Sequence, residues 1–184
     1  MRILPAIIAI VCRMNAEHDY AVRVEWQGNL GTGTSGYREY SRQHTVSAAG
    51  KHLIAGSADR TFHGDRERWN PEEMLLGAIS QCHMLSYLHV AVRRNIVVTG
   101  YEDQASGILV QRGLGGSFRE ATLRPVVTVA EEWMIGEAID AHAEAAEHCF
   151  IANSVNFPIA HRPVVRVARP RPPVPGRASL EPTE

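Results

Sequence analysis

Hydrophobic and polar residues alternate along the first part of the chain. Residues 19–27 have a period of two, which predicts a half-buried strand. The apolar positions of this strand are Tyr20, Val22, Val24 and Trp26. Two further extended segments are expected at residues 37–46 and 52–55, with a turn between them. Together these segments predict an antiparallel meander of three strands.

The longest apolar run, residues 70–94, has the pattern of one helix. Asn70 is a favourable N-cap, Pro71 suits the first helical position, and basic residues fall in the last turn. Apolar side chains lie on nearly all sides, as expected of a helix that is covered from several directions. Cys82 lies in the middle, on a mainly apolar face, so its thiol is either a packing residue or a nucleophile.

The second half of the chain predicts a hairpin, a helix and a last strand. Residues 96–110 and 120–130 are rich in Val, Ile, Thr and Leu and flank a glycine turn. Residues 133–149 have a helical period, and residues 157–167 favour a short strand. The helical stripe consists of Ile135, Ile139, His142, Ala146 and Cys149. This order of elements predicts an α+β fold, with antiparallel sheets packed around the long central helix.

The two ends of the chain differ from the rest in composition. Residues 1–13 form an apolar run that is shorter than the roughly 20 residues needed to span a bilayer. No small-x-small cleavage pattern follows, so an upstream extension before a functional start at Met14 is preferred to a signal peptide. Residues 169–184 are rich in proline and arginine, which predicts a disordered tail. One domain is therefore expected over residues 14–168.

Composition narrows the classes of function. Apolar residues make up 45% and charged residues 21% of the chain, as in ordinary soluble globular proteins. A net charge of −1 carries no electrostatic signature of nucleic-acid or membrane-surface binding, so we expect neither partner. The cysteines, Cys12, Cys82 and Cys149, are too few for a disulfide framework. A reducing, cytoplasmic location fits them best.

A metal site is a competing interpretation of the cysteines and histidines of the two helices. The residues in question are Cys82, His83, His89, His142, His148 and Cys149. None of these pairs has the i, i+4 spacing of a helical metal site, and His83 points about 100° around the helix from Cys82. We therefore expect no metal and no other cofactor.

The sequence NPEE at residues 70–73, the apolar run that ends in Gln81-Cys82, and the late Cys149 together resemble the OsmC/Ohr family of thiol-dependent hydroperoxide reductases. In that family pattern the peroxide-reacting cysteine follows the Glu by ten residues, which pairs Glu72 with Cys82. The resemblance spans roughly residues 19–167. It implies an intertwined homodimer with active sites at the subunit interface.

The resemblance also assigns roles to residues. Cys82 would attack the peroxide as a thiolate, and Cys149 would resolve the resulting sulfenic acid by forming a disulfide. Because free cysteine has a pKa of about 8.5, such a site needs a guanidinium, here oriented by Glu72. Arg38, in the sequence GYRE, resembles the Gly-Gly-Arg-Asp segment of the Ohr branch. Arg60, close to the position that the OsmC branch uses, is the alternative.

Ten helical residues span about 15 Å, so Glu72 and Cys82 of one chain do not touch directly. An arginine from another segment, or Glu72 of another chain, must close this gap. His83 is a departure from the commonest family pattern, which has an aromatic residue after the cysteine.

The expected function is that of a thiol-dependent peroxidase that reduces organic hydroperoxides to alcohols. The apolar face beside Cys82 favours alkyl or fatty-acid hydroperoxides over hydrogen peroxide. The resemblance implies a dithiol or a lipoyl-protein as the reductant. The alternatives are a dimeric ligand-binding module or a structural stress protein of the same fold, neither of which is an enzyme.

Overall fold

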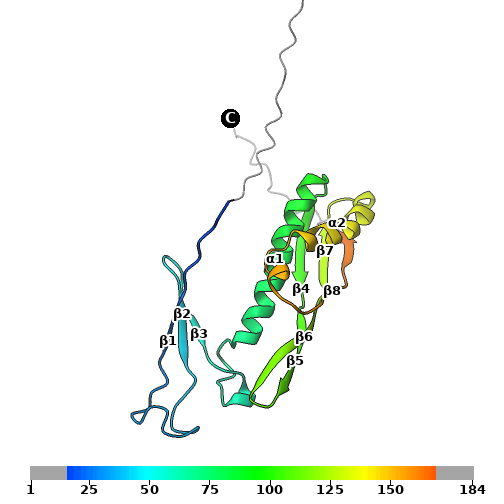
Figure 1. Cartoon of the computed structure of the whole chain (residues 1–184). Helices are drawn as coiled ribbons and strands as arrows, with labels where there is room; N and C mark the ends of the chain where they lie inside the picture. The colour runs from blue at the N-terminus through cyan, green and yellow to red at the C-terminus, as the bar shows by residue number, and fades with distance from the viewer. Residues whose placement is uncertain (1–15, 169–184) are drawn as a thin grey trace, which may run out of the picture. The chain divides into compact units, whose positions relative to one another are not determined.

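The computed structural model describes residues 16–168, and their contacts fall into two compact units that divide between Trp69 and Asn70 (Figure 1). Two predicted segments lie outside the described residues: the extension at residues 1–13, which includes Cys12, and the tail at residues 169–184.

The N-terminal unit is a three-stranded antiparallel sheet in the order β1-β2-β3, which confirms the predicted meander. Its strands are β1 (Arg23–Trp26), β2 (His44–Ser47) and β3 (Ile54–Gly56). The strands are shorter than the alternating segments from which they were predicted. A 3₁₀ turn, Arg60–Phe62, follows, and the Asp59 carboxylate caps it by accepting a 2.7 Å hydrogen bond from the amide of Thr61.

Both faces of β1 are exposed, which corrects the prediction of a half-buried strand. The apolar residues of the alternating segment are all exposed, from 46% for Trp26 to 90% for Tyr20. The physical reason is that three strands make a single layer, and a sheet buries its apolar face only beneath a second layer. The N-terminal unit contains no such layer among its described residues.

Helix α1 spans Pro71–Arg93, as predicted from its end signals. Asn70 Oδ1 accepts a 2.8 Å hydrogen bond from the amide of Glu73, and the Glu73 carboxylate accepts a 3.5 Å bond from the amide of Asn70. This reciprocal capping box satisfies two amides that would otherwise lack partners in the first turn. After the helix, Asn95 adopts a left-handed conformation (φ 56°) and turns the chain toward β4.

One side of α1 is buried and another is exposed. The buried residues are Ile79, His83, Tyr87, Val90 and Ala91. Leu85 and Val92 are 60% and 75% exposed, and only 28% of the most apolar stretch of the helix is buried. By length and composition α1 would also suit a membrane span, a property that it shares with the core helices of globular proteins.

Two three-stranded sheets belong to the C-terminal unit. Their orders are β4-β7-β9 and β5-β6-β8. The strands are β4 (Val98–Asp103), β5 (Ser106–Arg112), β6 (Gly115–Leu123), β7 (Pro125–Val129), β8 (Ile159–His161) and β9 (Val164–Val167). The β4/β7 and β5/β6 pairs are antiparallel, but β6/β8 and β7/β9 are parallel. The expectation of antiparallel sheets is therefore wrong for the last strands, because the chain returns to them through a helical crossover.

The predicted long hairpin is divided between the two sheets. The chain changes sheet after β4 and again at Arg124, so one hairpin supplies four strands. The tip of the hairpin is at Gly113, whose φ of 62° is easily adopted by a residue without a side chain.

Helix α2 (Ile135–Glu147) follows a 3₁₀ turn, Glu132–Met134, and packs against α1 and β9 (Figure 1). Its buried face consists of Ala138, Ala141, His142 and Ala145. Ile139, which was expected inside, is 45% exposed, so the predicted stripe is partly wrong. Alanines line the buried side because small side chains allow the two helices to approach closely. The core joins this face to Tyr87 and Val90 of α1 and to Val127 and Val129 of β7.

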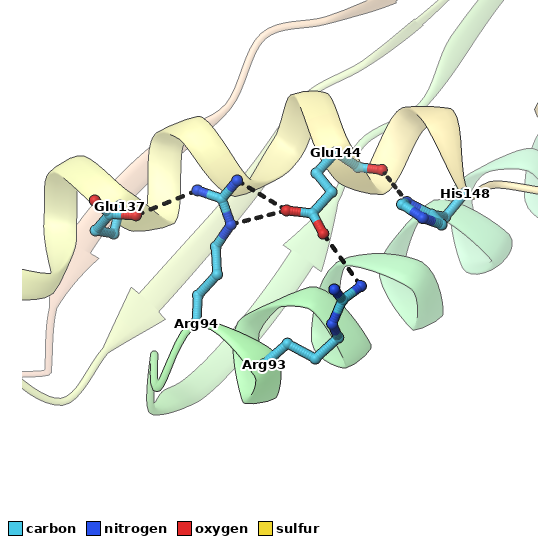
Figure 2. Close-up of polar contacts among 5 residues, drawn as sticks. All are labelled: Arg93, Arg94, Glu137, Glu144 and His148. Atoms are coloured by element: carbon cyan, nitrogen blue, oxygen red, sulfur yellow. Dashed lines mark hydrogen bonds and ion pairs between the residues drawn. The ribbon is translucent and has the colours of Figure 1, made fainter. Parts of the chain in front are cut away.

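Charged residues also connect the end of α1 to α2 (Figure 2). The Arg94 guanidinium lies 2.8 Å from one Glu144 carboxylate oxygen and 3.2 Å from Glu137, while Arg93 lies 3.4 Å from the other Glu144 oxygen. Hydrogen bonding to Arg94 holds the pKa of Glu144 below its usual value. His148 is the residue before Cys149, and its Nδ1 atom lies 2.7 Å from the backbone carbonyl oxygen of Glu144.

Candidate active site

The packing of α1 against α2 brings Cys82 and Cys149 together. Cys82 lies in the middle of α1, and Cys149 lies just after the last residue of α2. The Cys82 thiol lies close enough to Cys149 to raise the pKa of the Cys149 thiol. Cys149 is fully buried, whereas Cys82 is partly exposed. The structure therefore places the two predicted redox cysteines in contact, with one of them accessible and the other enclosed.

The turn that follows α2 supplies backbone amides to both sulfur atoms. The amide of Ile151 donates to Cys82 Sγ at 3.5 Å. The amides of Ile151 and Ala152 also lie close enough to Cys149 to lower the pKa of its thiol. Amide donors favour the thiolate over the thiol, because they stabilise the charged form. Sequence reasoning missed this feature, since a backbone amide can belong to any residue except proline.

The turn itself is held in place by local hydrogen bonds. The amide of Asn153 donates to the carbonyl oxygen of Cys149 at 3.0 Å, and the Ser154 hydroxyl donates to the carbonyl oxygen of Phe150 at 2.7 Å. The Asn153 side chain donates to the carbonyl oxygen of Glu147 at 2.9 Å. These bonds fix the direction of the Ile151 amide relative to α2.

The two cysteines differ in their electrostatic environment. Burial raises the pKa of the Cys149 thiol to about 11, and the neighbouring Cys82 thiol pushes it in the same direction. The amide hydrogen bond from Ala152 acts against this increase. Cys149 is consequently a protonated thiol near neutral pH, and a protonated thiol is a poor nucleophile.

Glu72 lies in the first turn of α1, far along the helix from Cys82. Its Oε2 atom is buried and has no hydrogen-bond partner among residues 16–168. Buried carboxylate oxygens nearly always have a donor, so this atom marks a position where a donor is expected.

The two arginines considered as that donor both belong to the N-terminal unit. Arg38 lies between β1 and β2, Arg60 begins the 3₁₀ turn before α1, and both are exposed. Within the described part of the chain, neither forms an ion pair. The pairing of either arginine with Glu72 stays a prediction.

Three histidines pack against one another inside the C-terminal unit and form a histidine cluster. His83 Nε2 lies 3.0 Å from His142 Nδ1, and the ring centroids of His83 and His161 are 4.4 Å apart. Tyr87 stacks on His142 at 4.1 Å. Sequence reasoning had considered His83 and His142 as metal ligands but missed their contact, and it missed His161 on β8 entirely.

The histidine cluster is neutral at physiological pH. Burial lowers the pKa of His83 to about 3 and that of His142 to about 4, and it also lowers the pKa of His161. Among residues 16–168, no group of three or more His, Cys, Asp or Glu side chains is placed to hold a metal ion. His83 therefore faces α2 as a packing residue, while Cys82 beside it faces the turn after α2.

A family model supports the assignment that these features suggest. The model described as OsmC-like protein matches residues 63–162, which is more than half of the chain. This chain belongs to the OsmC-like family. The match includes α1 with Glu72 and Cys82, and it includes α2 with Cys149.

Solved structures of OsmC-like proteins share the fold of this one. An OsmC-like protein of unknown function from Vibrio cholerae is 29% identical, with a TM-score of 0.73 over 80% of this chain and 100% of that one. An organic hydroperoxide resistance protein from Elizabethkingia anophelis is 17% identical, with a TM-score of 0.59 over 83% and 100%. Another from Legionella pneumophila is 18% identical, with a TM-score of 0.58 over 81% and 98%. A search of curated proteins gave no match.

Proposed function

We propose that this OsmC-like protein is a thiol-dependent peroxidase that reduces organic hydroperoxides to alcohols. The observation that carries the proposal is the contact between the partly exposed Cys82 and the buried Cys149 across two packed helices. Two proteins of the same fold are named for organic hydroperoxide resistance, which points to peroxide stress as the setting. Cys82, Cys149, Glu72 and an arginine would form the catalytic set.

In the first step, the Cys82 thiolate attacks one oxygen of the hydroperoxide. The O–O bond breaks, the alcohol leaves after taking up a proton, and Cys82 becomes a sulfenic acid. The amide of Ile151, 3.5 Å from Cys82 Sγ, stabilises the thiolate before attack.

In the second step, the Cys149 thiol gives up its proton to the sulfenic oxygen as its sulfur attacks the sulfenic sulfur of Cys82. The S–S bond forms, and the sulfenic oxygen leaves as water with the proton of Cys149. A dithiol, either a small molecule or a lipoyl-protein, then reduces the disulfide. Such a cycle suits a cytoplasmic location, where dithiol reductants are maintained.

Exposure and charge state determine which cysteine attacks. Cys149 is fully buried, and its pKa of about 11 keeps it protonated, so peroxide would reach Cys82 first. A protonated resolving cysteine is also protected from direct oxidation. We therefore assign Cys82 as the attacking residue and Cys149 as the resolving one.

A guanidinium beside Glu72 would complete the site. The unpartnered Oε2 atom of Glu72 supports this part of the proposal. We propose Arg38 as its source, with Arg60 as the alternative. The exposed apolar side of α1 supports a homodimer, since a second copy would cover it.

The decisive experiment is a peroxide-consumption assay on the full chain. With dihydrolipoamide or dithiothreitol as reductant, the wild type should consume tert-butyl and cumene hydroperoxides faster than hydrogen peroxide. Cys82→Ser should abolish turnover. Cys149→Ser should still be oxidised once per chain but should not form the intrachain Cys82–Cys149 disulfide.

Cys12→Ser is the matched control and should turn over like the wild type. Equal inactivity of the wild type and of Cys82→Ser would overturn the enzymatic proposal and would favour the dimeric ligand-binding or stress protein. A disulfide between chains, detected by mass spectrometry of the oxidised protein, would remove Cys149 from its assigned role.

A further inference from the structure

A second concave site lies on the sheet β4-β7-β9, away from the cysteines. It is a cleft of about 340 Å³, within the size range of small-ligand pockets. Its lining residues are Glu102, Gln104, Arg124, Val126, Arg162, Val164 and Arg166. We call it the arginine cleft.

The strand register explains why these residues share one face. Glu102 of β4 pairs with Val126 of β7, and Val126 pairs with Val164 of β9. The alternate residues of β7, Val127 and Val129, are fully buried in the core beside α2. The arginine cleft therefore occupies the opposite face of the sheet from α2.

Backbone and side-chain contacts hold the three arginines in position. The Arg124 guanidinium donates to the Ser106 hydroxyl at 2.7 Å and to the carbonyl oxygen of Gln104 at 3.4 Å. The Arg166 Nε donates to the Thr128 hydroxyl at 3.2 Å. The amide of Arg162 donates to the carbonyl oxygen of Leu123, next to Arg124 in the chain.

Positive charge exceeds negative charge among the described residues of the arginine cleft. Each guanidinium contact just described is to a neutral acceptor. Among residues 16–168, none of the three arginines forms an ion pair. Among the described residues that line the cleft, Glu102 is the only acidic one, so these residues carry a net charge of +2.

From this arrangement we infer that the arginine cleft binds a small organic molecule with two or more oxyanion groups, either carboxylates or phosphates. Guanidinium groups match the planar oxygen pairs of both groups and bind them with two parallel hydrogen bonds. Glu102 and Gln104 lie on the β4 side of the cleft, and Arg162 and Arg166 lie on the β9 side. The oxyanion groups of the ligand are thus directed toward β9, away from the Glu102 carboxylate.

Isothermal titration calorimetry on the full chain tests this inference, with citrate and tripolyphosphate as separate probes. We expect saturable binding of at least one probe with one site per chain, and the preferred probe identifies the oxyanion class. The double variant Arg162→Gln/Arg166→Gln should weaken binding about tenfold or more, because it removes two charge-assisted contacts. Peroxide turnover should be unchanged, since the cleft lies on the other face of the sheet.

Two further variants separate a loss of binding from a loss of structure. Arg119→Gln, an exposed arginine of β6 outside the cleft, should bind like the wild type. Glu102→Gln should bind a few-fold more tightly, because it removes a repulsive carboxylate, and misfolding cannot produce such a gain. The absence of saturable binding by the wild type would overturn the inference. So would equal weakening by Arg119→Gln and the double variant.

Discussion

At the scale of single residues, the side chains in and beside the candidate site differ in their degree of burial. The thiol of Cys149 and the rings of the histidine cluster are buried without charge, whereas Cys82 is partly exposed and accepts a hydrogen bond from the Ile151 amide. The same burial that keeps Cys149 protonated also keeps His83 and His142 neutral.

The buried, neutral histidine cluster predicts that the free energy of unfolding decreases at acidic pH. The pKa of His83 falls to about 3 and that of His142 to about 4 in the folded chain, from about 6.5 when unfolded. As the pH falls, protons therefore bind these histidines in the unfolded chain before they bind them in the folded chain. The stability that the folded chain has with neutral histidines is fully present above about pH 6.5 and is lost as the pH falls toward about 4. Each histidine contributes up to about 1.4 kcal/mol per pH unit in that window. Urea unfolding at several pH values measures this dependence.

His83→Phe should reduce this pH dependence, even though it also removes the 3.0 Å contact with His142. His89→Gln, at an exposed position of α1, is the control and should retain the wild-type slope. An unchanged slope in His83→Phe would show that His83 does not remain neutral in the folded protein.

At the scale of elements, the turn after α2 holds the Ile151 amide 3.5 Å from Cys82 Sγ, a contact that the sequence does not reveal. Ile151 has φ −70°, a value that proline also adopts, so Ile151→Pro removes the amide donor at little cost in its own φ. In a chain that lacks Cys12 and Cys149, we expect this variant to alkylate Cys82 with iodoacetamide about tenfold more slowly at neutral pH. Ile151→Ala keeps the amide and is the control. Equal rates for the two variants would exclude the amide from activation of Cys82.

Sequence analysis succeeded for elements whose signals are local. The cap at Asn70 and the basic last turn fixed α1 at both ends, and the family pattern correctly associated Cys82 with α1 and Cys149 with the end of α2. The sequence did not predict the features that depend on contacts between residues distant in the chain. The hairpin divides at Arg124 because its strands serve two sheets, and β8 and β9 run parallel to strands that precede α2. The contact between the rings of His161 and His83 was missed for the same reason, because β8 and α1 are distant in the chain.

At the scale of the whole molecule, the exposed apolar side of α1 predicts self-association. Leu85 and Val92 are 60% and 75% exposed, and a groove of about 470 Å³ continues from Val92 to Val98. Apolar surface of this kind on a long helix favours a symmetric dimer. Sedimentation velocity at micromolar concentration should show a dimer for the wild type. It should show a monomer for Leu85→Glu/Val92→Glu. Ile139→Glu, on the exposed side of α2, should leave the dimer intact.

The same double variant links assembly to chemistry. Cys82 and Cys149 belong to one chain and one helix pair, so the monomeric variant should still form the intrachain disulfide when treated with a strong oxidant. If the guanidinium for Glu72 comes from a second copy, peroxide turnover should nevertheless fall by at least about tenfold, because the activating charge is absent. A monomeric variant with full turnover would place that guanidinium within the same chain. A wild type that sediments as a monomer would contradict the dimer itself.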